Sequence, residues 1–303
     1  MRGQGSISRI MKKTKSDISA SFVHSLTTTK SNVMLKLITI RFIVNLLISC
    51  SNGTITNDSI PIYDSFTTQT ESLLEERVIN VWKPSGYNES IDSLPVLYMP
   101  DGGTKEDFPH IANTLAKRFE AQKIEPIILV GIENTERGRD LTGASTTAYD
   151  KQFCPVTDGA KVFRAFISKE LVPSINLRCH TTGIKGIVGE SFAGLFVMET
   201  FLISPSTFDF YIAMDPSFWW DHHFLIENTD LLLSGFTAKI RSLWYAGSSA
   251  EEISKHTKGL SITFRKLAPQ NLTWKYSDQP KKGHNTIFKA TKEQAFIWAI
   301  NLI

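Results

Sequence analysis

The chain has 303 residues, 42% of them hydrophobic, and a formal net charge of +3 at pH 7. This length suits a single globular α/β domain, and the sequence contains no internal repeat or low-complexity segment. The small charge excess disfavours a nucleic-acid partner, and the sequence lacks phosphate-loop and zinc-ligand spacings, so we expect no cofactor and no metal.

The first 49 residues are predicted to be a leader. From Met34 an apolar run extends to Ile48, which is typical of a secretory signal and is too short and too interrupted by Arg41 to span a bilayer stably. The run ends in Leu-Ile-Ser-Cys at 47–50, which resembles a bacterial lipobox. Cys50 is therefore the predicted lipidation site. A lipid anchor there would place the protein in the cell envelope, on the periplasmic or surface side of a membrane.

Two alternatives concern this leader. Residues 1–33 are rich in Ser, Thr, Lys and Arg with almost no acids, a composition that also suits an organellar transit peptide. If Met34 is the true start, residues 1–33 are not translated. After the cysteine, residues 50–70 are expected to be a polar tether that leads to a folded domain spanning 71–303.

Predicted strands and helices alternate along the folded domain. Glu76–Trp82 alternates polar and apolar residues, as a half-buried strand does. Five later apolar runs are typical of buried strands, at 96–99, 127–132, 184–188, 211–214 and 243–246. Ala160–Ile175 has one apolar face at helical spacing and is expected to stop near Pro173. We therefore predict an α/β fold with a mostly parallel central sheet and helices on both faces.

The sharpest motif is Gly-Glu-Ser-Phe-Ala-Gly at 189–194, between a buried strand and an apolar helical stretch at 195–203. Strand, tight turn and helix around Gly-x-Ser is the setting of a nucleophile elbow, which lifts a serine hydroxyl out of the sheet. The fifth position of the usual Gly-x-Ser-x-Gly is Ala193, and the glycine follows one residue later. Ser191 is the predicted nucleophile, and the backbone N–H of Phe192 is a predicted donor to an oxyanion.

Such an elbow predicts its partners in the chain order serine, acid, histidine. Of the seven histidines, only His284 lies in a late, glycine-flanked loop, so it is the predicted base. The acid candidates are Glu251 and, less favoured, Glu252, both in the loop after the last predicted strand. Asp215 is a rival acid, although its loop has the character of a structural corner.

Two segments follow predicted strands at the carboxyl edge, where open α/β sheets bind ligands. Gly102 or Gly103 can bring a second backbone N–H close to an oxyanion, because neither has a Cβ; the alternative is a plain turn. Arg137 is the basic residue expected to be free to meet an acidic substrate group. Arg139 and Asp140 either line the pocket or form a structural ion pair.

Trp219 and Trp220 follow the 210–214 strand at the same edge. Large flat side chains there can form an acyl or aryl pocket. Tryptophan more often packs beneath a loop, so only one of the two is expected to touch substrate.

Four segments in the correct order carry a family resemblance: 97–103, 135–142, 189–194 and 216–221. Together they resemble the putative-esterase family of α/β-hydrolases, which includes siderophore (enterochelin) esterases and S-formylglutathione hydrolase. The resemblance runs from about Glu76 to the C-terminus and is nearest to the predicted-hydrolase branch of that family.

The resemblance implies roles for three residues: Ser191 as nucleophile, His284 as base and Glu251 as acid. Ala250 stands where the family usually has asparagine, which weakens the assignment of the acid. Some siderophore esterases of this group work with a serine–histidine pair alone, so the acid is either Glu251, Glu252 or absent.

The function implied is a serine-dependent carboxylic ester hydrolase that forms an acyl-enzyme on Ser191. Its small-molecule substrate is expected to be an ester of a siderophore or of an acylated sugar. Two alternatives remain: an acyltransferase with the same acyl-enzyme, and a non-catalytic binding lipoprotein on a hydrolase fold. The sequence does not identify the substrate or the oligomeric state.

Overall fold

The computed structural model describes residues 60–87, 92–237 and 239–303. The predicted leader, Cys50 and the first part of the predicted tether lie outside these ranges. The described residues, from Ile60 to Ile303, form one compact unit. Within the described ranges, no helix combines the length and the apolar character needed to cross a membrane.

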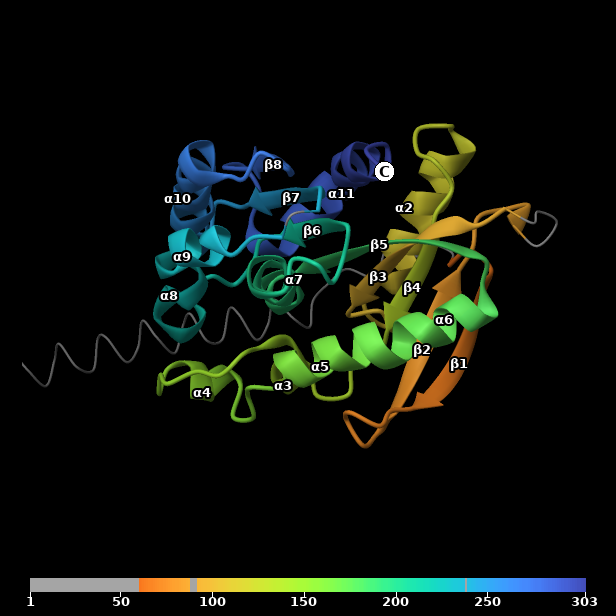
Figure 1. The fold of residues 1–303 in the computed structure, drawn as a ribbon, viewed down its shortest axis with the longest axis horizontal. Coiled ribbons are helices and arrows are strands. Elements are labelled where there is room, and N and C mark those ends of the chain that lie inside the picture. The colour runs from red at the N-terminus through yellow and green to blue at the C-terminus, as the bar shows by residue number, and fades with distance from the viewer. Residues whose placement is uncertain (1–59, 88–91, 238) are drawn as a thin grey trace, which may run out of the picture. The chain divides into compact units, whose positions relative to one another are not determined.

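One eight-stranded sheet forms the centre of this unit, in the order β1-β2-β4-β3-β5-β6-β7-β8 (Figure 1). The strands are Tyr63–Gln69 (β1), Glu76–Trp82 (β2), Leu94–Pro100 (β3), Ile128–Ile132 (β4), Thr181–Glu190 (β5), Phe210–Met214 (β6), Arg241–Gly247 (β7) and Leu272–Asp278 (β8). The pairings β1–β2 and β2–β4 are antiparallel, and all pairings from β4 to β8 are parallel. The predicted α/β class and mostly parallel sheet are confirmed.

The sequence pattern does not indicate the two edge strands. β1 lies in the segment predicted to be a tether, so that boundary is wrong: Tyr63 pairs with Trp82, and the register continues to Gln69 and Glu76. Most side chains of β1 and β8 are exposed or half-buried. An edge strand pairs on one side only and buries little, so it leaves no apolar run in the sequence.

Helices cover both faces of the sheet (Figure 1). On one face lie α2 (Phe108–Glu120) and α11 (His284–Ile300). On the other lie α5 (Ala160–Phe166), α6 (Val172–Arg178), α7 (Phe192–Ile203) and α10 (Glu251–Leu267). Four short helices occupy connections: α3 (Arg137–Leu141), α4 (Asp150–Phe153), α8 (Trp220–Glu227) and α9 (Thr229–Ser234).

The helix predicted over 160–175 is present, but it continues through Pro173. A π-helical turn, η2 (Ile167–Leu171), joins α5 to α6, and the proline falls in the first turn of α6. Proline has no N–H to donate to the preceding turn, and the π-helical turn directly before it is where the regular hydrogen-bond pattern of the helix changes.

A buried ion network ties β2 to α3. The Arg77 side chain is fully buried and contacts the carboxylates of Glu75 and Asp140. Arg139 contacts the same two acids, at 2.8 Å and 2.7 Å. Buried charges persist when each is paired in this way. Of the two interpretations of Arg139 and Asp140, the structure therefore favours the structural ion pair.

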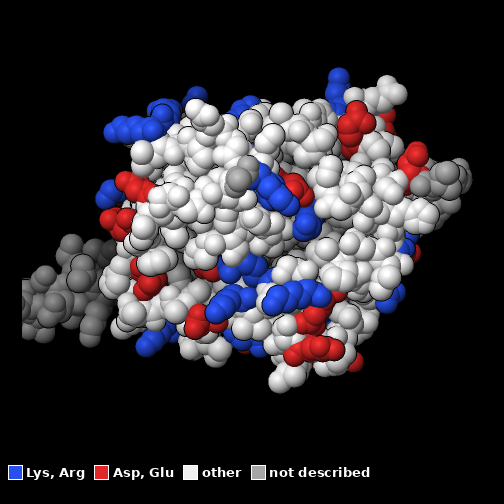
Figure 2. Space-filling model, in the orientation of Figure 1, with Lys and Arg blue, Asp and Glu red and all other residues white. Residues whose placement is uncertain are grey.

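Surface charges of both signs are mixed. Lys83 pairs with Asp64 at 2.7 Å, and Lys258 lies 3.5 Å from Asp278. On the face drawn in Figure 2, basic and acidic side chains are interspersed, and large areas carry neither. This face therefore presents no extended field of one sign.

Candidate active site

Ser191 lies in the turn between β5 and α7, at the carboxyl edge of the sheet, with φ 58° and ψ −115°. A positive φ is strained for a residue that has a Cβ. Backbone hydrogen bonds hold the turn: the Ser191 N–H donates to Met214 O at 3.0 Å, and Ser191 O accepts from the N–H groups of Leu195 and Ser217. The strand, tight turn and helix predicted around this serine are therefore present.

Small residues beside Ser191 let α7 approach β5 closely. A Cβ on Gly189 would lie 2.6 Å from the Cβ of Ala193, and a Cβ on Gly194 would lie 2.8 Å from Met214 O. Because Gly189 has no side chain, there is room for the methyl group of Ala193 at the fifth motif position. The shifted Gly194 serves a different contact, the close approach of α7 to the end of β6.

Three side chains from separate parts of the chain form a hydrogen-bonded row. His284 Nε2 lies 3.1 Å from Ser191 Oγ, and His284 Nδ1 lies 2.6 Å from Asp215 Oδ2. A carboxylate can only accept, so Nδ1 carries the proton and Nε2 is left to accept from the serine hydroxyl. The Asp215 side chain is fully buried, whereas that of His284 is 24% exposed. In this arrangement an imidazole can act as general base toward a serine.

The carboxylate at His284 is thus that of Asp215 and not, as the sequence predicts, that of Glu251. β6 pairs directly with β5, so the residue after β6 lies beside the residue after β5. The predicted loop follows β7, one strand further away, and both Glu251 and Glu252 are exposed in the first turn of α10.

The loop after β7 still contributes to this row, through its backbone. Ser248 donates its N–H to Asp215 Oδ1 at 2.6 Å. Each oxygen of the Asp215 carboxylate therefore has a donor, one from this loop and one from His284. The signal in the sequence was the position of Asp215 directly after a buried strand, next to the strand that ends at the nucleophile.

The two glycines predicted as oxyanion donors have occupied N–H groups. Gly102 donates to Ile132 O at 2.9 Å, and Gly103 donates to Glu106 Oε2 at 2.7 Å. A Cβ on Gly102 would lie 2.2 Å from Ile132 N, so this glycine serves the packing of the β3 end against β4. The prediction for Gly102 is wrong, and Gly103 can donate to an oxyanion only after the Glu106 side chain releases it.

Phe192 remains available as a donor. It is the first residue of α7, and the N–H groups of a first helical turn have no intrahelical acceptor. This N–H belongs to the residue after Ser191, where the helix N-terminus also favours negative charge. Its position suits the stabilisation of an oxyanion formed at Ser191.

Arg137 adjoins the Ser191 turn but is not free, as the sequence suggested. Its Nε and one terminal nitrogen bind the two carboxylate oxygens of Asp101, at 2.7 Å and 2.8 Å. Its guanidinium lies 5.6 Å from the centre of the Phe192 ring. The charge of Arg137 is therefore balanced within the protein, at the edge where a ligand would lie.

The two tryptophans differ in exposure. Trp220 is 5% exposed, and its indole N–H donates to Gly143 O at 3.1 Å. Trp219 is half-buried and forms the centre of an aromatic cluster. Ring centres of three neighbours lie 5.2–5.8 Å from it: Tyr149, Phe153 and Phe192. Trp219 is therefore the more accessible of the two rings, and Trp220 packs in the interior.

Glu190, directly before the serine, was not singled out from the sequence. Its Oε1 is buried and has no hydrogen-bond partner within the described part of the chain. Burial raises the pKa of Glu190 well above its ordinary value, and the nearby carboxylates of Asp107 and Asp215 act in the same direction. Burial therefore favours the uncharged acid at this position more than it would for an exposed glutamate.

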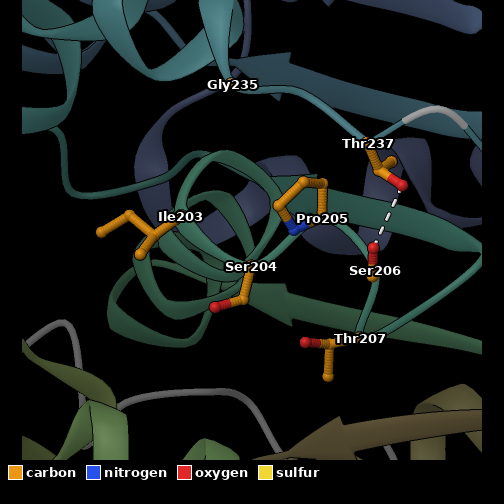
Figure 3. A pocket seen from close by; sticks show the side chains of 7 residues that line it. All are labelled: Ile203, Ser204, Pro205, Ser206, Thr207, Gly235 and Thr237. Carbon is orange, nitrogen blue, oxygen red and sulfur yellow. Dashed lines mark hydrogen bonds between the residues drawn. The ribbon is translucent and has the colours of Figure 1, made fainter.

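A pocket of about 410 Å³ lies elsewhere, at the amino end of β6 (Figure 3). It is lined by residues 203–207, Gly235 and Thr237, and Ser206 donates to Thr237 Oγ1 at 3.1 Å. The lining contains no titratable side chain. In a parallel sheet the amino ends face the edge opposite Ser191, so this pocket is not part of the candidate site.

A family model described as "Putative esterase" matches residues 70–299. The chain belongs to this esterase family. The esterase is 28% identical over 244 residues to the ferri-bacillibactin esterase BesA of Bacillus subtilis. That alignment covers 72% of this chain and 80% of BesA. It is 25% identical over 261 residues to the apo-salmochelin esterase of Escherichia coli, an alignment that covers 78% of this chain and 79% of that protein.

Solved structures agree with the family. The crystal structure of an IroE-like serine hydrolase from Shewanella oneidensis superposes on the esterase with a TM-score of 0.72 at 28% identity, covering 79% of this chain and 80% of that one. The fold is that of an α/β-hydrolase, and the esterase is an enzyme of the carboxylic ester hydrolase class.

Proposed function

We propose that the esterase is a serine hydrolase that forms an acyl-enzyme on Ser191. The observation that carries this proposal is the row of Ser191, His284 and Asp215 at the carboxyl edge. As Ser191 Oγ attacks the ester carbonyl, His284 Nε2 takes its proton, and Asp215 stabilises the imidazolium. His284 returns the proton to the leaving alcohol and then activates the water that releases the acid.

The oxyanion of each tetrahedral intermediate needs donors in place. The Phe192 N–H is the first. The second donor in this proposal is the Gly103 N–H, freed when Glu106 turns away. Burial raises the pKa of Glu106, and the nearby Asp101 carboxylate acts in the same direction, while hydrogen bonds from Gly103 and Asn134 oppose the shift.

We propose an ester of a siderophore as the substrate class. The names of the Bacillus subtilis and Escherichia coli relatives support this class. The half-buried ring of Trp219, which contacts Phe192 and the exposed Tyr149, also suits a flat aryl group. An acylated sugar is the second substrate class to be assayed.

Hydrolysis and acyl transfer share the acyl-enzyme, so the row of three side chains supports both. Product formation that depends on an added sugar or lipid hydroxyl would identify an acyltransferase. A non-catalytic binding lipoprotein is set aside, because the chain is an enzyme of the esterase family.

The test is covalent labelling by a fluorophosphonate, with hydrolysis of a siderophore ester, an acetylated sugar and an aryl acetate measured in parallel. Ser191→Ala should lose both label and turnover. Ser217→Ala is the matched control, because its Oγ lies only 3.4 Å from Ser191 Oγ and it should keep the label. Labelling that survives in Ser191→Ala would contradict the assignment of the nucleophile.

We also propose that Cys50 carries a lipid that anchors the enzyme to a membrane of the cell envelope. The support is the sequence pattern at 47–50 alone, which lies outside the described residues. Wild type should partition into detergent, and Cys50→Ser into the aqueous phase, with Ser51→Ala as control. Targeting of a tagged chain to an organelle would favour the transit-peptide alternative.

A further inference from the structure

Three side chains outside the Ser191 site converge on one point: His223, Glu252 and His256. One donor atom of each lies within 4.8 Å of the other two. His223 comes from α8, while Glu252 and His256 lie one turn apart on the same face of α10. Imidazole nitrogens and a carboxylate oxygen are donors that Zn²⁺ binds in proteins.

We propose that His223, Glu252 and His256 form a Zn²⁺ site that joins α8 to α10. Three protein ligands leave a fourth position of the tetrahedron for water. None of the three residues belongs to the row of Ser191, His284 and Asp215, so the site is a second one, distinct from the reaction centre.

The hydrogen bond of His223 leaves its Nε2 atom able to bind a metal. Its Nδ1 lies 3.1 Å from Phe218 O, and because a carbonyl only accepts, this nitrogen carries the proton. Nε2 then has a free lone pair. Metal-binding histidines are commonly fixed by such a bond from the other ring nitrogen to a backbone carbonyl.

The two imidazoles lie against each other. Their centres are 4.0 Å apart and their planes differ by 23°. The ring of His223, from α8, is therefore in direct contact with the ring of His256, from α10.

The backbone before His223 is strained in a way that directs this side chain. Asp221, His222 and His223 have φ values of 45°, 52° and 64°, three consecutive left-handed residues with a Cβ. The Asp221 N–H donates to Asp150 Oδ2 at 2.7 Å, which helps to hold the turn. Such strain persists where the surroundings compensate it, often at ligand sites. A bond from His223 to a metal would be a further compensation.

Glu252 is the ligand that completes the site. It is exposed, so its side chain can rotate, whereas His256 is buried and fixed. Donors around a tetrahedral Zn²⁺ with bonds of about 2.1 Å lie closer together than the 4.8 Å limit found here. Rotation of the exposed Glu252 side chain can bring its carboxylate closer to the two rings.

The position of the site suggests a structural role. α8 begins directly after Trp219, and the loop before α10 carries Ser248, whose N–H binds Asp215. A metal that joins these two helices would stabilise the aromatic cluster around Trp219 and the loop that orients Asp215. It would supply no group to the ester reaction.

The test is titration of the full-length, metal-stripped protein with Zn²⁺ in competition with a chromogenic chelator. Wild type should bind one Zn²⁺. Glu252→Gln and His256→Gln should each weaken binding by at least the roughly 10–100-fold that loss of an outer partner of a metal site costs. The matched controls are the exposed neighbours of the same types, Glu251→Gln and His222→Gln, which should bind as wild type does.

A second measurement separates folding from binding. Zn²⁺ should raise the Tm of wild type and of both controls but not that of Glu252→Gln, in which an exposed side chain is exchanged. Two outcomes would overturn the proposal: equal affinity of wild type, Glu252→Gln and His256→Gln, or loss of binding in His284→Ala, which would place the metal at the reaction centre. Neither readout depends on ester hydrolysis.

Discussion

Asp215 Oδ2 lies 2.6 Å from His284 Nδ1, although 69 residues separate them in the chain. The contact exists because β6 ends beside β5, and because α11 begins with His284 at the same edge of the sheet. Asp215 and Ser191 each directly follow a strand, with φ values of 48° and 58°. Both side chains are therefore placed by strained turns at the ends of rigid strands.

Two variants distinguish Asp215 from Glu251 as the acid that acts on His284. In Asp215→Asn the amide can donate to His284 Nδ1 and so favour the unproductive tautomer, and kcat should fall by on the order of 10³–10⁴-fold. Glu251→Gln, which changes an exposed side chain, should stay within about twofold of wild type. Steady-state kinetics on an aryl ester measure both, and a larger loss in Glu251→Gln would contradict the assignment of Asp215.

Glu190→Gln should change how stability depends on pH. Unfolded glutamate titrates near about pH 4.3, and in the folded protein its pKa is higher. Between the two pKa values the folded state binds more protons, so the free energy of unfolding of wild type falls by up to about 1.4 kcal/mol per pH unit as pH rises. Glutamine carries no such proton and escapes this loss.

The measurement is urea unfolding of wild type and Glu190→Gln at a series of pH values. Their stabilities should be similar below about pH 4, and the variant should gain on wild type as pH rises above the unfolded pKa. Glu251→Gln is the exposed control without such a trend. A difference between Glu190→Gln and wild type that is constant with pH would refute this prediction.

The two tryptophans should respond differently to truncation. Trp220→Ala removes a buried ring and should lower the free energy of unfolding by about 3–5 kcal/mol. Trp219→Ala should cost less stability and should raise KM for aryl substrates, because its half-buried ring contacts Phe192, the residue next to Ser191. Urea unfolding and KM values test the pair, and an unchanged KM in a folded Trp219→Ala would remove this residue from the substrate site.

Two glycines provide opposite tests of packing. A Cβ on Gly102 would lie 2.2 Å from Ile132 N, whereas nothing lies within 4 Å of a Cβ on Gly259, inside α10. Gly102→Ala should destabilise the protein by at least the roughly 1–3 kcal/mol of an overpacked core. Gly259→Ala should stabilise it by about 0.5–1 kcal/mol, since alanine is the better helix former. Thermal unfolding measures both, and a neutral Gly102→Ala would show that β3 and β4 separate easily.

Local pattern predicted the buried centre of the fold. A parallel strand covered on both faces leaves an apolar run in the sequence, and the run at 127–132 corresponds to β4 at Ile128–Ile132. The turn at 189–194 was recognisable from its Gly-x-Ser pattern. His284 was recognisable from its late, glycine-flanked position, although the structure places it in the first turn of α11 and not in a loop. The edge strand at Tyr63–Gln69 buries too little to be seen in this way.

The sequence by itself determined the buried strands, the elbow at Ser191 and the histidine that meets it, because burial and tight turns impose patterns on neighbouring residues. Only the tertiary structure decided which acid reaches His284, since strand order sets which loop ends are adjacent. It also decided the pairing of Arg137 with Asp101 and the meeting of His223 with Glu252 and His256. Contacts between residues far apart in the chain produce no recognisable residue spacing in the sequence, because the length of the chain between two residues does not fix how they lie in space.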